Sequence, residues 1–149
     1  MPDTFGGFLV ASLGAVKRDA PACANAIASA IGPAGIELVV DAERMVVHAG
    51  PEIVIVVGPA ASDLARRGGL AIHVATTARA LLALIDGEDE LYAAIVDNRV
   101  RVRAARRDAE RLFDAMRWFV EGCARTSAAP ALLAEYRCQK GPDPDRRPT

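Results

Sequence analysis

The stretch that decides the fold is residues 70–103, which read LAIHVATTARALLALIDGEDELYAAIVDNRVRVR. Apolar side chains alternate along residues 70–75, which predicts a strand. A threonine pair then opens a leucine-rich helix that stops at Gly87, and an acidic start opens a second short helix that stops near Asn98. Valine and arginine alternate over residues 100–103, which predicts another strand with one wet face. Strand, helix, helix and strand in so few residues form a tight unit with one apolar side.

Two helices are predicted near the start of the chain. Apolar residues recur every three or four positions over residues 5–16, which indicates an amphipathic helix, although three glycines weaken it. Asp19 resembles an N-cap, and Pro21 fits the first turn of a following helix. The Gly-Pro pair at residues 32–33 ends that second helix.

Three short strands are predicted next, over residues 36–40, 45–49 and 53–57, at the spacing of an antiparallel meander. The last of them is a continuous β-branched run, which is typical of a central strand that is covered on both faces. Residues 58–69 leave two alternatives open. They form either a loop with a helical turn or a crossover that sets residues 53–57 parallel to residues 70–75.

The last strong pattern is a long amphipathic helix over residues 106–123. The chain then divides into an N-terminal amphipathic helix (residues 1–18), one α+β domain (residues 19–138) and a tail (residues 139–149). Prolines without an apolar anchor predict that the tail is disordered. The mixture of predicted helices and strands is therefore typical of a single α+β domain.

Composition and charge exclude several classes of protein. The length of 149 residues, with 52% apolar and 25% charged residues, favours one globular domain. A net charge of -1 gives no bulk attraction to nucleic acid, and no apolar run approaches the ~20 residues of a stable membrane span. The three cysteines are odd in number and lack a CxxC pair, which predicts reduced thiols in a cytoplasmic protein. Arginine in place of most lysine, with many alanines, suggests a bacterial origin.

Chemical motifs are sparse. His48 and His73 lie on the polar phases of their strands and fall short of a zinc site, because a third ligand is missing. Residues 58–63 lack the ending of a P-loop, and the acidic residues 86–90 do not fit an EF-hand. The alternating arginines within residues 99–103 form either a site for an anionic head group or a solvated, salt-bridged face. We therefore predict no catalytic residue, no cofactor and no metal.

The pattern of residues 70–119 resembles the sterol carrier protein type-two-like family. The shared features are a strand followed by threonines, an LLxLIxG-type helix end at residues 81–87, a short helix, a strand and a long final helix. The preceding helix and meander follow the family's order, so the resemblance covers roughly residues 20–122. It implies a five-stranded, mainly antiparallel sheet with helices on one face, and an apolar cavity between sheet and helices.

The function that this resemblance implies is non-catalytic binding or transfer of a hydrophobic small molecule, such as a fatty acyl, sterol or isoprenoid-like lipid. The protein would present this lipid to a partner enzyme, or act as a homodimer, without nucleic acid and without stable insertion into a membrane. The predicted lining residues are apolar side chains on the phases that face the helix layer. They are Leu38, Val40, Val47, Ile55, Ile72, Val74, Leu82, Phe113, Met116 and Phe119.

Two alternative functions stay open at this point. The first is a scaffold or dimerisation partner in a biosynthetic enzyme complex, with the cavity collapsed, because many alanines on the helices suit close packing. The second is a small α/β enzyme, which requires residues 53–57 and 70–75 to pair in parallel.

Overall fold

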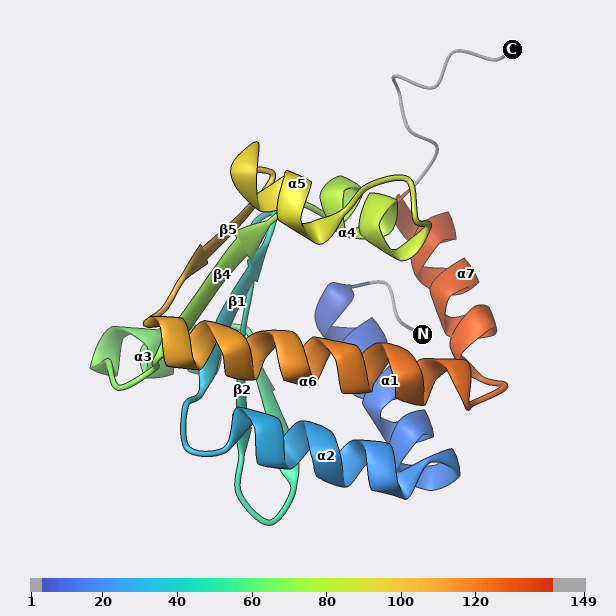
Figure 1. The fold of residues 1–149 in the computed structure, drawn as a ribbon, viewed down its shortest axis with the longest axis horizontal. Helices are drawn as coiled ribbons and strands as arrows, with labels where there is room; N and C mark the ends of the chain where they lie inside the picture. The colour runs from blue at the N-terminus through green and yellow to red at the C-terminus, as the bar shows by residue number, and fades with distance from the viewer. Residues whose placement is uncertain (1–3, 141–149) are drawn as a thin grey trace.

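A mixed sheet of five strands forms the centre of the molecule (Figure 1). The computed structural model describes residues 4–140. The strands are β1 (Ile36–Val40), β2 (Glu43–Ala49), β3 (Ile53–Val57), β4 (Ile72–Thr76) and β5 (Val100–Arg103). They lie in the order β3-β2-β1-β4-β5, with β1 and β4 parallel and the other three pairings antiparallel. The predicted α+β class with a mainly antiparallel, five-stranded sheet is therefore confirmed.

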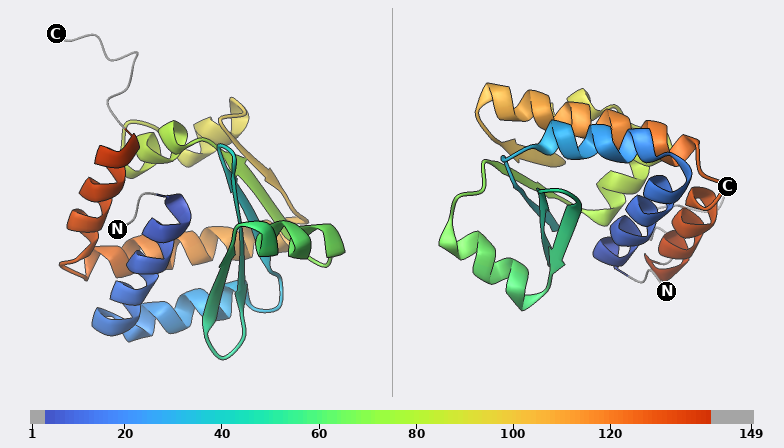
Figure 2. Two further views of the ribbon diagram at one scale, coloured as in Figure 1. Left: turned by 180° about the vertical axis from the view of Figure 1, so that it is seen from behind. Right: turned by 90° about the horizontal axis from the view of Figure 1, so that it is seen from below.

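The helices lie on both sides of this sheet, but very unequally (Figure 2). One side carries α1 (Phe5–Asp19), α2 (Pro21–Ile31), α4 (Ala78–Ile85), α5 (Leu91–Val96), α6 (Arg106–Ala124) and α7 (Ala129–Lys140). The opposite side carries α3 (Pro59–Arg67), which packs on β2 and β3. Ala61 of α3 and Val46 of β2 are buried in this smaller contact. The main helix layer is thus on the predicted single face, and α3 adds partial cover behind it.

The segment between β3 and β4 resolves the alternatives left open for residues 58–69. Most of it is the helix α3, and β4 pairs with β1 instead of with β3. The parallel pairing that an α/β enzyme would have needed is absent from the sheet of residues 4–140. The prediction that β3 is a central strand was wrong, because β3 lies at the edge of the sheet. Its β-branched run is explained by contacts with α1 on one face and α3 on the other.

Residues 70–103 fold as their local signals predict. The Thr77 side chain accepts a hydrogen bond from the Ala80 amide at 3.1 Å and caps α4. Gly87 and Asn98, with φ angles of 72° and 60°, take the left-handed conformation just after α4 and α5. Each helix end depends on residues close to it in the chain, which explains why the sequence alone predicts it.

The turn between α1 and α2 differs from the prediction. Asp19 is the last residue of α1, and Ala20 stands at the N-cap of α2 without a side-chain hydrogen bond. The Asp19 carboxylate instead accepts a hydrogen bond of 2.6 Å from the Thr126 hydroxyl. This bond, and Arg18 beside it, lower the pKa of Asp19. Asp19 therefore ties the α1–α2 turn to the α6–α7 turn.

The first helix is anchored to the sheet at its N-terminus. The Glu43 carboxylate of β2 accepts hydrogen bonds from the amides of Phe5 at 3.0 Å and Gly6 at 2.7 Å. These amides have no partner within the helix, so the carboxylate satisfies them and favours the positive end of the helix dipole. Residues 5–19 thus pack on the sheet of the α+β domain. At the other end of the chain α7 extends through Lys140, and residues 141–149 of the predicted tail lie outside the described residues.

The apolar core is divided into two clusters. The first lies between the sheet and the helices α2 and α6, with Ile27, Ile36, Ile72 and Leu112 among its buried members. The second lies between the sheet, α1, α4 and α7. Its buried members are Phe5, Phe8, Val40, Met45, Ala78 and Tyr136. The gap between these clusters is where the candidate site lies.

Tyr136 gives the second cluster a pH dependence. Burial raises the pKa of Tyr136 to about 12, and the carboxylates of Glu43 and Asp41 add to the rise. Because the unfolded tyrosine titrates near pH 10, its stabilising contribution is complete below that pH and is lost as the pH rises toward 12. We expect the wild-type protein to lose about 2 kcal/mol more stability than Tyr136→Phe between about pH 9 and about pH 12. Urea unfolding of both proteins across this range measures the difference, and parallel pH profiles would contradict it.

Gly122 sets how closely α6 approaches the first two helices. A Cβ atom at Gly122 would lie 2.6 Å from the Val16 side chain and 3.3 Å from Cys23. We expect Gly122→Ala to lower the free energy of unfolding by about 1–3 kcal/mol, because the added methyl overpacks this contact. Gly14→Ala is the matched control, since apart from its chain neighbours and the backbone of its own helix no atom lies within 4 Å of its added Cβ. That control should gain up to about 1 kcal/mol from helix propensity. If Gly122→Ala and Gly14→Ala changed the free energy of unfolding by the same amount in urea, α6 would not be packed closely at Gly122.

Candidate ligand cleft

One row of sheet residues that faces the helices is only partly buried. Leu38, Val74 and Val102 lie side by side on β1, β4 and β5 in the strand register. All three are apolar, yet each is only half-buried. The neighbouring rows are buried, and their members are Ile36, Ile72, Val40, Thr76 and Val100. On β1, β4 and β5 the partial exposure of the helix-facing side is therefore confined to a strip across the middle of these strands.

This strip lies at the boundary between the two core clusters. Val74 and Val102 pack against the first cluster, whereas Leu38 packs against the second. Helix α6 packs extensively along α2, but in residues 4–140 neither α4 nor α5 packs extensively against α6. The helices on the two sides of the strip are thus separated, and space remains above it.

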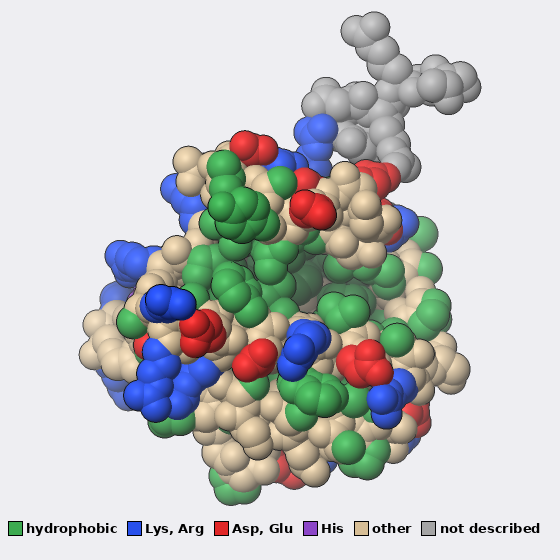
Figure 3. Space-filling model, in the orientation of Figure 1, with side chains coloured by type: hydrophobic (Ala, Val, Ile, Leu, Met, Phe, Trp, Pro, Cys, Tyr) green, Lys and Arg blue, Asp and Glu red, His purple; other side chains and the backbone are tan. Residues whose placement is uncertain are grey.

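Side chains of α6 and α4 form the walls of this space. A Cβ added at Gly122 would meet Cys23 of α2, and one at Gly32 would meet Arg111, so this side of α6 faces α2. With 3.6 residues per turn, Phe113 and Met116 lie on the side of α6 that is turned away from α2. Leu82 of α4 packs against the second cluster on the other side of the strip. Figure 3 shows an apolar hollow between α6 and the pair α4 and α5. We call this hollow the α4–α6 cleft, and from the positions above we infer that it is bordered by Leu38, Val74, Leu82, Val102, Phe113 and Met116.

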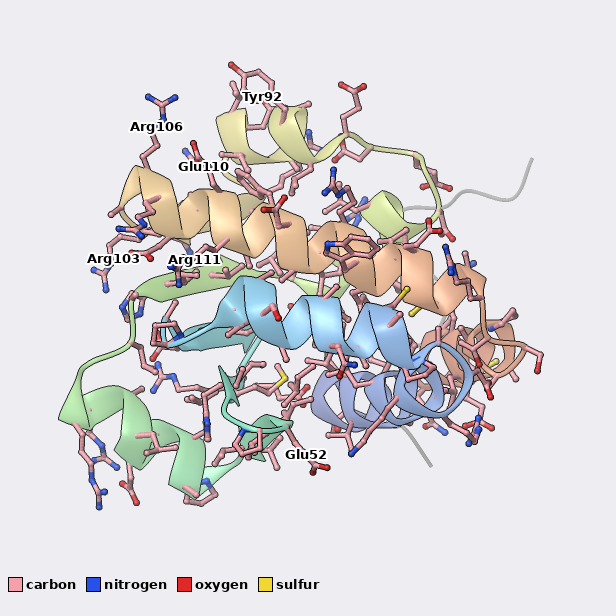
Figure 4. All side chains as sticks on the ribbon, turned by 60° about the horizontal axis from the view of Figure 1, so that its bottom comes forward. Glu52, Tyr92, Arg103, Arg106, Glu110 and Arg111 are labelled. Atoms are coloured by element: carbon pink, nitrogen blue, oxygen red, sulfur yellow. The ribbon has the colours of Figure 1, made fainter. Side chains whose placement is uncertain are left out.

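The rim of the α4–α6 cleft combines exposed apolar and charged side chains. Tyr92 and Val96 of α5 are 78% and 62% exposed, and Phe113 is 39% exposed. Figure 4 shows Tyr92 projecting from α5 into solvent and Glu110 standing on the α6 side that faces α5. Glu110 pairs with Arg106 at 3.4 Å in an exposed ion pair. The rim can therefore contact both an apolar chain and a polar head group.

The ten predicted lining residues do not all lie in one place. Leu38, Val74, Leu82, Phe113 and Met116 belong to the residues that we infer to border the α4–α6 cleft. The other five lie elsewhere in the core: Val47 and Ile72 are buried in the first cluster, Phe119 and Ile55 pack against it, and Val40 is buried in the second.

Val102, which is paired with Val74 in the strand register, belongs to the inferred cleft but is absent from the ten predicted lining residues. Its signal was present in the sequence, because alternation with Arg101 and Arg103 places it on the helix-facing side of β5.

A second hollow lies at the other edge of the sheet. It is a groove of about 530 Å³ between α1, α2 and the start of β3, and we call it the β3-edge groove. Val10, Leu13 and Lys17 of α1 line one side, and residues 51–55 line the other. Ile55 is the predicted lining residue that borders this groove.

The polar residues singled out in the sequence are mostly engaged with one another. His73 Nδ1 lies 3.2 Å from the Glu37 carboxylate, and His48 lies on β2, separated from β4 by β1. Arg99 precedes β5 and pairs with Asp89 and with Asp97, the latter at 2.9 Å. Within residues 4–140 no group of three or more His, Cys, Asp and Glu side chains is arranged to hold a metal ion. The same residues contain no helix that is long and apolar enough to span a membrane.

Comparisons with known proteins identify the fold. No protein-family model matches the chain, and no curated protein matches its sequence. The structure is similar to that of UbiJ-SCP2, a ubiquinone synthesis protein, with 17% identity, a TM-score of 0.51, and coverage of 73% of this chain and 84% of that one. It is also similar to apo sterol carrier protein 2 from Yarrowia lipolytica, with 12% identity, a TM-score of 0.48, and coverage of 85% and 96%. The strand order and the likeness to UbiJ-SCP2 show that this chain has the sterol carrier protein type-two-like fold.

Proposed function

We propose that the protein binds a single hydrophobic small molecule in the α4–α6 cleft and carries it without transforming it. The observation that carries this proposal is the half-buried row Leu38, Val74 and Val102, which lies between fully buried rows beneath an apolar hollow. An apolar strip in mid-sheet costs free energy while it faces water, and an apolar ligand that covers it recovers about 25 cal/mol per Å². Concave apolar sites with a polar rim are the usual form of small-molecule sites.

The ligand class follows from the shape and chemistry of the cleft. An apolar wall with the Arg106–Glu110 ion pair at its rim suits a fatty acyl or isoprenoid-like chain with a polar head near these two residues. The likeness to a ubiquinone synthesis protein supports the isoprenoid class, and presentation of the ligand to a biosynthetic enzyme. Met116 is a soft, unbranched side chain that adapts to ligands of different shape. We place this carrier in the cytoplasm, in keeping with its free thiols at Cys23, Cys123 and Cys138.

Fluorescence titration tests the proposal. A fluorescent fatty acid should bind with saturation at one site per chain and be displaced by unlabelled fatty acids, sterols or isoprenoid quinones. Because each buried methylene contributes about 0.8 kcal/mol, affinity should rise about fourfold per added methylene until the cleft is full. The proposal would be overturned if the fluorescent fatty acid did not bind and neither sterols nor isoprenoid quinones bound, or if none of the three lipid classes displaced a bound probe. An affinity that does not change with chain length would argue for adsorption to the surface.

A further inference from the structure

The β3 edge of the sheet exposes an uninterrupted apolar strand. Strand β3 pairs with β2 and forms the end of the sheet among residues 4–140. Its residues Ile53–Val57 read IVIVV, without a charge, and Val54 and Val57 are 43% and 49% exposed. Val10 of α1, which borders the β3-edge groove, is 51% exposed. An apolar edge strand without a charge or a bulge is a template for pairing with another strand.

The ladder with β2 shows which backbone groups of β3 point outward. The Gly50 amide bonds across the hairpin to the Glu52 carbonyl at 3.0 Å. Because bonded pairs alternate along an antiparallel ladder, the next bonded pairs are His48 with Val54 and Val46 with Val56. The amides and carbonyls of the odd-numbered residues 53, 55 and 57 therefore point away from β2. This set is a complete hydrogen-bonding row for one more strand.

The sequence around β3 is nearly symmetric about Ile55. Residues 51–59 read PEIVIVVGP, with a proline four positions before and four positions after Ile55. We propose that β3 pairs with β3 of a second copy of this chain, antiparallel and centred on Ile55, so that two sheets join into one. In this register Ile53 lies opposite Val57 of the other copy, and Val54 lies opposite Val56. Each cross-strand pair is then β-branched and neutral, the kind of pair that stabilises a sheet.

The prolines and charges favour this register over others. Proline lacks an amide hydrogen, so a shifted pairing would bring Pro51 or Pro59 into the ladder. The centred pairing keeps both prolines outside it and sets the Glu52 carboxylate opposite Gly58. Glu52 is also paired within its own chain, with Lys17 at 2.6 Å. Within the paired segments, residues 51–59, no like charges therefore lie directly opposite each other.

The two-fold pairing also accounts for the β3-edge groove. A two-fold axis perpendicular to the sheet places both helix layers on the same side. The grooves of the two copies then face each other above the new strand pair, and the exposed Val10 of each copy borders the junction. This dimer is independent of lipid binding in the α4–α6 cleft, so each proposal can fail without the other.

The first test is the oligomeric state of the whole chain by sedimentation equilibrium. We expect a wild-type dimer, and we expect Val54→Lys to raise its dissociation constant at least about tenfold, by loss of two valine pairs and by like charge across the junction. Val120→Lys on α6 is the matched control, because Val120 is 67% exposed and lies outside the β3 edge, and it should remain dimeric. A monomeric wild type, or equal effects of both lysines, would overturn the proposal.

Cysteine cross-linking tests the register itself, and it does so even where Val54→Lys fails to fold. In a background where the exposed Cys138 is replaced by serine, Ile55→Cys should form a disulfide between copies, because directly opposed bonded residues have Cα atoms about 5.5 Å apart. Val57→Cys should not, since two copies of residue 57 would lie four positions, about 13 Å, apart along the strands. Cross-linking at residue 57 instead of residue 55, or at neither position, would overturn the centred pairing.

Discussion

Replacing Met116 by tryptophan should weaken binding of a fluorescent fatty acid at least about tenfold. The indole is larger than the thioether chain and would occupy the space between α6 and the row Leu38, Val74 and Val102. A ligand that loses contact for two methylenes loses about 1.6 kcal/mol, which is more than a factor of ten in affinity. The measurement is a displacement titration with the same probe for wild type and variant.

Ala124→Trp is the control for this result. Ala124 is the last residue of α6 and is exposed, so the same indole is added to the same helix outside the cleft. We expect the affinity of this variant for the fluorescent fatty acid to stay within about twofold of the wild-type affinity, a difference of less than about 0.5 kcal/mol. If Met116→Trp retains full affinity while folding normally, the ligand does not occupy the α4–α6 cleft.

Replacing Tyr136 by alanine should lower the free energy of unfolding by about 3–5 kcal/mol. Tyr136 is completely buried and stacks on Phe8 with ring centroids 5.4 Å apart, and it meets Phe5 edge-on at 5.8 Å. Removing its ring leaves a cavity between α1 and α7 that the stiff sheet behind it cannot fill. Urea unfolding measures the loss.

Tyr136→Phe distinguishes the contribution of the aromatic ring to stability from that of the hydroxyl. It retains the stacking on Phe8, so at neutral pH we expect it to stay much closer to wild type than the alanine variant does. Arg137 next to it pairs with Asp86 at the end of α4, which gives α7 a second, exposed attachment. A loss of less than about 1 kcal/mol in Tyr136→Ala would mean that α7 does not depend on this cluster.

Local signals made much of the fold predictable. Thr77, Gly87 and Asn98 act through hydrogen bonds and backbone angles within a few residues of themselves, so sequence reading located α4, α5 and β5. The alternation of Val100 and Val102 with arginines likewise predicted which side of β5 faces the helices. Periodicity reports such features because they depend on neighbours in sequence.

Features that depend on the placement of whole elements were harder to predict. The β-branched run of β3 is typical of a central strand, but the α3 crossover moves β4 to the far side of β1 and leaves β3 at the edge. The prediction of the residues that line the cleft was limited for the same reason. Val74 and Ile72 look alike in sequence, yet Ile72 is buried under the first cluster while Val74 is half-buried between the two clusters. The difference arises from where α4 and α6 stand above the sheet.

The central claim is that the α4–α6 cleft holds a hydrophobic molecule, and native mass spectrometry of the purified chain tests it most directly. We expect folded protein whose mass exceeds that of the chain by one lipid-sized increment per chain, removed by solvent extraction and restored by added lipid. The increment should be reduced in Met116→Trp and unchanged in Ala124→Trp. A bare chain mass, both as purified and after incubation with fatty acid, sterol and isoprenoid quinone, would contradict the claim.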